Sequence, residues 1–343
     1  MNIENLMFEF NKVIVHPAFV DTIEEISKIA LSLPDFTINV KHIPEEMLFS
    51  KGELIVPVGS IKKISLNLKK GVEQLKRGFP ITAYDESIDK FISLEGTAYS
   101  TSHSLVLLAP NSFIPANYLT FYFYTKSKAL IERSKYIRFS PEPEIDSKKD
   151  YIRDRIRFLE KTVPGKSILL IDGPLIGGDV YTIMIQSIQA FHDKNIIPVF
   201  FVKNSSSNLV TDNIKELRKK YNSDLHWSYK FLKPGERTNF FIYRDRVNPR
   251  NAKAFCYLKA FTVSPQRIEV HLDTYNKYNS LINDLMELVY YLLIVQGNIK
   301  NPQIRPIAVA EMYARETIRL FDIYSLLRRA GITPTMNQNR FGG

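Results

Sequence analysis

Two carboxylates stand where predicted strands end, the position at which an α/β sheet often presents functional side chains. Asp172 follows the continuous apolar run 167–171, and Glu95 follows the shorter run 91–94. Carboxylate oxygens are good ligands for hard divalent cations, so two such acids could hold one cation for metal-assisted hydrolysis of a phosphodiester. The alternative for Asp172 is an acid that only caps the turn or the next helix.

Other kinds of catalytic site find little support in the sequence. It contains neither a GxxxxGK[ST] phosphate loop nor a GxSxG nucleophile elbow. The one cysteine, Cys256, lies in an apolar aromatic run and is expected to be a buried thiol. A single cysteine also excludes disulfide scaffolds and cysteine-based zinc sites. The histidines lack the close pairing of a histidine metal site, so a bound metal would depend mainly on oxygen ligands.

The charge balance indicates a polyanionic partner. Lys and Arg total 46 against 36 for Asp and Glu, a net charge of +10. Lys203, after the apolar run 197–202, and Arg237, after Pro-Gly-Glu, are candidates for contacts with the phosphates of such a partner. A solvated lysine in a loop is the alternative for Lys203.

The elements that must position these residues are strands and helices in alternation. Runs 91–94, 104–108 and 118–124 predict an antiparallel meander, and the apolar runs 167–171 and 197–202, separated by a helix, predict parallel strands. Further strands are expected at 240–243, 254–261 and 268–272, and helices at about 149–162, 181–194, 280–296 and 306–330. The pattern predicts one α/β domain over 91–335, preceded by a helical and strand extension over 1–90.

Membrane insertion and secretion are not expected. The longest apolar stretch, Leu288–Val295, is shorter than the roughly 20 residues that a membrane helix needs. The first residues have an acid where a secretory signal has bases. We therefore expect a cytoplasmic protein.

Several segments, in order and spacing, resemble the NurA nucleases, which process DNA ends together with the HerA translocase. Segment 168–175 resembles a hydrophobic strand followed by Asp-Gly-Ser-Leu, and 94–97 with 104–108 resembles an amino-terminal Asp-Gly-Ser hairpin. The other similar segments are 199–205, 234–238, 257–259, 267–270 and 305–311. The resemblance spans about residues 90 to 330 and implies a ribonuclease-H-like mixed sheet with flanking helices.

The resemblance also implies a set of metal ligands. Glu95 stands where the family has Asp, and Glu311 stands where it has His, so Glu95, Asp172 and Glu311 would hold Mn²⁺ or Mg²⁺. The family has a further acid on the helix before the Asp-Gly strand. Counting along the chain places it at Asp154, whereas Glu160 flanks the apolar stripe of that helix, so both stay candidates. Either acid could instead be an exposed partner of neighbouring arginines.

The activity that the resemblance implies is a manganese-dependent deoxyribonuclease. It would be a single-strand endonuclease and 5′-to-3′ exonuclease, a homodimer, and a partner of a HerA-type hexameric ATPase in DNA end resection and recombinational repair. The substitutions at positions 95 and 311 also allow an inactive NurA-like DNA-binding or adaptor subunit. A ribonuclease is a third possibility, because the fold does not dictate the sugar.

Overall fold

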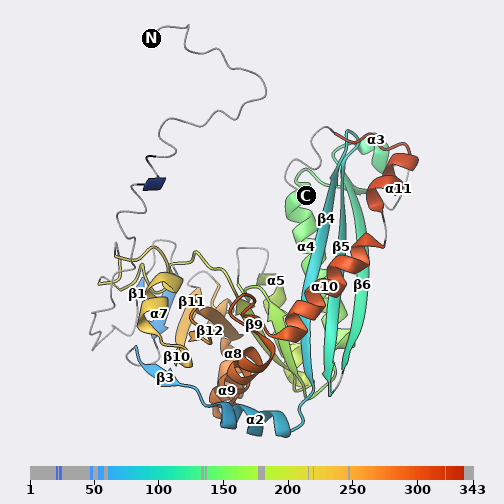
Figure 1. The fold of residues 1–343 in the computed structure, drawn as a ribbon. Helices are drawn as coiled ribbons and strands as arrows, with labels where there is room; N and C mark the ends of the chain where they lie inside the picture. The colour runs from blue at the N-terminus through green and yellow to red at the C-terminus, as the bar shows by residue number, and fades with distance from the viewer. Residues whose placement is uncertain are drawn as a thin grey trace, which may run out of the picture. The chain divides into compact units, whose positions relative to one another are not determined.

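The computed structural model describes residues 21, 23–24, 47–48, 53–57, 61–110, 112–132, 135, 137–176, 182–214, 216–218, 220–245, 248–320 and 322–335. The chain divides into two compact units, Met1–Thr37 and Ile38–Gly343. All of the elements named below belong to the second unit, and Figure 1 shows how they follow one another along the chain.

A mixed sheet forms the centre of this unit. It contains an antiparallel meander of β4 (Ile81–Ile92), β5 (Thr97–Ala109) and β6 (Ser112–Thr125). β8 (Ile168–Asp172) pairs in parallel with β4, and β9 (Ile197–Val202) pairs in parallel with β8. The order β6-β5-β4-β8-β9, with these strand directions, is a ribonuclease-H-like arrangement. The predicted fold class is therefore confirmed.

Antiparallel strands extend the sheet beyond β9. In order they are β13 (Gln266–His271), β12 (Ala252–Lys259), β11 (Phe241–Asp245), β2 (Glu53–Pro57) and β1 (Met47–Leu48). The other strands of the described chain are β3 (Lys63–Ser65), β7 (Ile137–Phe139) and β10 (Glu236–Thr238). Strands that were expected to form a separate extension thus pair with later strands in one sheet.

Helices cover both faces of the sheet (Figure 1). α4 (Pro143–Thr162), α5 (Thr182–Ile185) and α6 (Ile188–Asp193) pack on one face, and α9 (Asn279–Gln296) and α10 (Arg305–Arg319) on the other. The remaining described helices are α2 (Leu68–Lys76), α3 (Lys128–Ile131), α7 (Asp224–Phe231), α8 (Leu272–Lys277) and α11 (Ile323–Arg329). No helix in the described part of the chain is long and apolar enough to cross a membrane.

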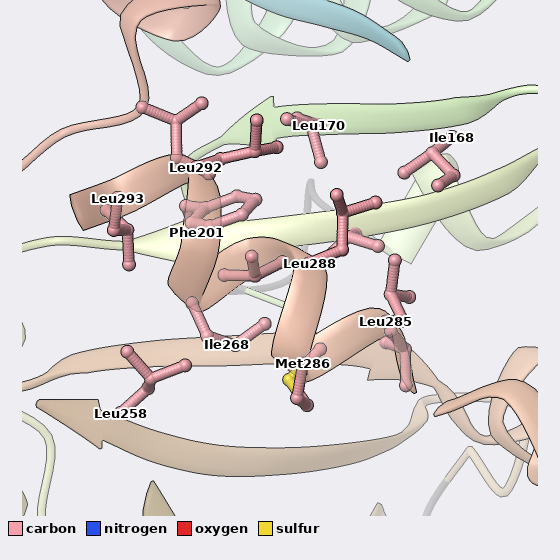
Figure 2. Close-up of a cluster of buried hydrophobic side chains, with 14 of the residues drawn as sticks. Ile168, Leu170, Phe201, Leu258, Ile268, Leu285, Met286, Leu288, Leu292 and Leu293 are labelled. Carbon is pink, nitrogen blue, oxygen red and sulfur yellow. The ribbon is translucent and has the colours of Figure 1, made fainter. Parts of the chain in front are cut away.

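The packing of the core explains why the central strands appear in the sequence as continuous apolar runs. Residues 168–171 of β8 are all buried, because helices cover the strand from both sides. Figure 2 shows Leu288 and Leu292 of α9 against Leu170 of β8 and Phe201 of β9. This double burial holds the carboxyl ends of β8 and β9 in fixed positions.

Three expectations differ from the observed elements. The helix expected over 181–194 is observed as α5 and α6, with a turn at residues 186–187 between them. The helix expected over 306–330 is two helices, because α10 ends at Arg319 and Asp322 starts α11 by accepting the Ser325 N–H at 2.9 Å. The expected division between residues 90 and 91 falls inside β4, since that strand continues without a break to Ile92. The first half of β4 thus lies in the centre of the sheet.

Candidate active site

Two acids lie at the carboxyl ends of the parallel pairing between β4 and β8. The strands pair in register up to Tyr84 opposite Ile171, so the next residues along them are Asp85 and Asp172. Side chains alternate along a strand, and the residues two positions before these acids belong to the core beneath α9. Both carboxylates therefore point to the same face of the sheet.

The environment of Asp85 disfavours its negative charge. The residue is 8% exposed, and its Oδ1 accepts the N–H of Glu86 at 2.8 Å. Burial raises the pKa of Asp85 to about 8, helped by the negative charges of Asp172 and Glu86 and opposed by the hydrogen bond from the Glu86 N–H and by Lys203. In the absence of another cation, the Asp85 carboxyl therefore keeps a proton at neutral pH.

Lys203 places a cation at the same pair of acids. It is the first residue after β9, the strand next to β8, and its Nζ donates to Asp172 Oδ2 at 2.7 Å. The other oxygen of Asp172 accepts the N–H of Gly173 at 3.1 Å. The Lys203 and Asp172 side chains are 28% and 22% exposed, so solvent and ligands can reach both. Two carboxylates and an ammonium thus meet at one edge of the sheet.

A second acid next to Asp85 points to the opposite face. Glu86 Oε1 lies 4.0 Å from Nη1 of Arg155, a buried residue of α4 whose guanidinium lies 4.8 Å from the Tyr84 ring centroid. Burial raises the pKa of Glu86, and Arg155 opposes this effect. The positive charge of Arg155 therefore favours the ionised form of Glu86, on the face of the sheet opposite to Asp85.

A comparison with known proteins decides the family. The model of the NurA domain matches residues 110–315, more than half of the chain. The chain belongs to the NurA family. No curated protein matches it. Membership confirms the resemblance that the order of sequence segments indicated.

Several solved structures match most of this chain. The NurA nuclease from Sulfolobus solfataricus matches over 92% of this chain and 98% of its own, with 12% identity and a TM-score of 0.50. A structure of NurA with manganese matches over 90% of this chain and 98% of its own, with 9% identity and a TM-score of 0.39. Endonuclease V from Ciona intestinalis, in complex with a 24mer DNA containing an inosine followed by a ribo-adenosine, matches over 71% and 88%, with 12% identity and a TM-score of 0.36.

The structure separates Glu95 from Asp172. β4 continues from Asp85 to Ile92, a rise of roughly 23 Å at about 3.3 Å per residue, before the turn that contains Glu95. There Glu95 Oε2 accepts the Thr333 N–H at 3.0 Å. Hydrogen bonds from its own backbone and from Thr333 lower the pKa of Glu95. The expected pairing of Glu95 with Asp172 is thus replaced by that of Asp85 with Asp172.

Glu311 lies on α10, the helix that packs on β4 and β5. Its carboxylate pairs with Arg315 one turn further along the helix. Within the described residues, no group of three or more His, Cys, Asp or Glu side chains is arranged to hold a metal ion. The predicted trio of Glu95, Asp172 and Glu311 is therefore not assembled.

The two acids considered on α4 make structural contacts. Tyr122 of β6 donates its hydroxyl hydrogen to Asp154 Oδ2, and burial raises the pKa of Asp154. Glu160 accepts a hydrogen bond from Lys194 through its backbone carbonyl. Neither of these contacts involves Asp85 or Asp172.

Arg237 is 2% exposed and lies on β10. Its Nη1 donates to the Thr238 carbonyl at 2.9 Å, and its Nη2 donates to Asn283 Oδ1 at 2.6 Å. These contacts hold the guanidinium inside the protein, away from the surface that the expected DNA contact requires.

Asp85 is the site residue that the sequence interpretation missed. The signal was present, because the run Ile81–Tyr84 ends in Asp85-Glu86-Ser87, which keeps the Asp and Ser of an Asp-Gly-Ser motif. The turn at Glu95-Gly96-Thr97 resembles the same three-residue pattern and is the segment that the sequence favours. The parallel register of β4 with β8 places Asp85, and not Glu95, next to Asp172.

Proposed function

We propose that this NurA family protein is a metal-dependent DNA nuclease with its centre at Asp85, Asp172 and Lys203. Family membership supports a nuclease-type function. The observation that carries the proposal is the position of Asp85 and Asp172 directly after the last paired residues of β4 and β8, with the Lys203 ammonium on Asp172. We propose the finer activities by analogy with the family: single-strand endonuclease and 5′-to-3′ exonuclease, acting as a homodimer with a HerA-type ATPase in DNA end resection and recombinational repair.

The two carboxylates fit a hard divalent cation. Asp85 holds a proton because burial and neighbouring negative charge disfavour its ionised form, and a bound cation would remove that penalty. Asp85 and Asp172 would be the ligands, and Glu311 on the neighbouring helix is the third candidate. Mn²⁺ or Mg²⁺ bound there would act as a Lewis acid toward a phosphate and lower the pKa of an attacking water.

The chain's own residues would orient the phosphodiester. The Lys203 ammonium is part-exposed and lies at the same edge as Asp172, so it can neutralise a phosphate oxygen that approaches the acids. The Asp172 Oδ1 contact to the Gly173 N–H fixes the carboxylate relative to the turn. Gly173 has φ +94°, a backbone conformation that favours glycine, so the turn after β8 depends on this residue.

An inactive adaptor subunit is the second candidate. The observation that favours it is the lack, within the described residues, of three acid, histidine or cysteine side chains grouped to hold a metal. Such a protein would keep the fold and the DNA contact but lose the hydrolysis.

The test is degradation of end-labelled single-stranded DNA, duplex DNA and RNA in Mn²⁺ by the wild type, Asp85→Asn and Asp172→Asn. Glu73→Gln, which changes an exposed acid of α2, is the matched control. Loss of DNA cleavage in both Asp variants but not in the control supports the nuclease. Absence of cleavage by the wild type, alone and with a HerA-type ATPase, supports the adaptor, and cleavage of RNA alone supports a ribonuclease.

A further inference from the structure

A buried charged cluster lies on the strands beyond β9, next to the loops that carry Asp172 and Lys203. Glu269 of β13 is fully buried, with Oε1 2.6 Å from Lys253 Nζ and 2.7 Å from Arg267 Nε. Burial alone would raise the pKa of Glu269, but the two cations lower it. The cluster therefore contains an ionised glutamate between two buried cations.

The cluster is bonded to both site loops. Glu269 Oε2 accepts the N–H of Leu175 at 2.9 Å, three residues after Asp172. Arg267 Nη1 donates to Ser205 Oγ at 2.9 Å and also to Ser207 Oγ, in the loop that begins at Lys203. Ser205 and Ser207 are further joined by a hydroxyl hydrogen bond of 2.8 Å.

We propose that Glu269 and Arg267 are positioning residues that hold the Asp172 turn and the Lys203 loop in the geometry that places Lys203 on Asp172. This inference rests on the proposed function, because it assigns the two residues to that site. Neither Glu269 nor Arg267 is a catalytic residue, since each acts through a loop that it anchors.

Stability alone is a poor reason for such a cluster. Removing charges from water is costly, and apolar residues of similar volume often replace a buried ion pair without loss of stability. The apolar replacement would leave the buried Leu175 N–H without an acceptor and would free the Ser205 and Ser207 hydroxyls. The hydrogen bonds that Glu269 and Arg267 make with polar groups of the two loops therefore give a reason for these buried charges.

The first test loosens one loop without altering the buried charges. Ser205→Ala/Ser207→Ala removes the two hydroxyl acceptors of Arg267 Nη1, and Ser280→Ala, at an exposed position of α9, is the control. We expect faster amide hydrogen exchange over residues 203–210 in the double variant, with the rest of the fold unchanged. We also expect kcat for DNA cleavage to fall about tenfold while KM stays within about twofold, because orientation rather than binding is lost.

The second test isolates the hydrogen bond to Leu175. Lys253→Met/Glu269→Gln and Lys253→Met/Glu269→Leu leave the same net charge in the cluster, and only the glutamine retains an acceptor. We expect the glutamine variant to keep slow exchange at Leu175 and most of its kcat. The leucine variant should exchange faster there and show the same loss of kcat at unchanged KM.

Amide hydrogen exchange that is unchanged in both loops of these variants would overturn the inference. It would also be overturned if kcat and DNA affinity fell together, in proportion to the fraction of each variant that is folded. The exchange measurement does not require activity. If the loops loosen as expected but the wild type cleaves nothing, the anchoring stands and the nuclease function fails.

Discussion

The pH dependence of the free energy of unfolding should reveal the raised pKa of the Asp85 carboxyl. In the metal-free folded protein the carboxyl keeps its proton up to a pKa of about 8, whereas the same group ionises near 3.8 in the unfolded chain. Between these values the folded state binds more protons than the unfolded state, so this group makes stability fall as pH rises. Below about pH 4 and above about pH 8 its contribution is constant.

Asp85→Asn removes this titration and should stabilise the metal-free protein at high pH. The roughly four pH units between 3.8 and 8, at about 1.4 kcal/mol each, set an upper bound of roughly 6 kcal/mol. Because the site can relax and admit water, we expect about 3 kcal/mol at pH 8.5 and little difference at pH 4.

Urea unfolding in EDTA across this pH range measures the difference, with Glu73→Gln as the control. Adding Mn²⁺ should stabilise the wild type and not Asp85→Asn, because the carboxylate that favours the ion is absent. Parallel stability curves for wild type and Asp85→Asn from pH 4 to pH 8.5 would refute the reasoning.

Three further variants test the assignments of other residues. Glu95→Gln should cleave DNA as the wild type does, because the Glu95 carboxylate lies in the distant β4–β5 turn. Loss of cleavage in this variant would show that Glu95 belongs to the active site. Lys203→Met should lower kcat by about 100-fold, because Asp172 and the phosphate lose their cation, and a full rate would contradict its role. Tyr122→Phe should lower the free energy of unfolding by about 1–2 kcal/mol by removing the hydrogen bond to buried Asp154, as urea unfolding would show, while cleavage by the folded protein is unchanged.

The sequence was sufficient where burial dictates the pattern. β8 and β9 are covered on both faces, so they appear as continuous apolar runs, and their parallel pairing brings Asp172 and Lys203 together. The positions of both residues could therefore be predicted from strand ends alone.

Asp85 could not be found in the same way. It lies inside the long strand β4, which continues past the site through the exposed residues 88–90 to Ile92, so no turn marks the point where pairing with β8 stops. Glu95 does lie in a turn, the one between β4 and β5, and therefore resembles a strand-end acid in the sequence. Register between distant segments, which local pattern does not encode, distinguishes the two.

The most direct test of the central claim is calorimetric titration of Mn²⁺ into the metal-free protein. We expect the wild type, Glu95→Gln and Glu73→Gln to bind the ion, and Asp85→Asn and Asp172→Asn to lose that binding. Retained binding in Asp85→Asn together with loss in Glu95→Gln, or no binding by the wild type, would contradict a metal centre at Asp85 and Asp172.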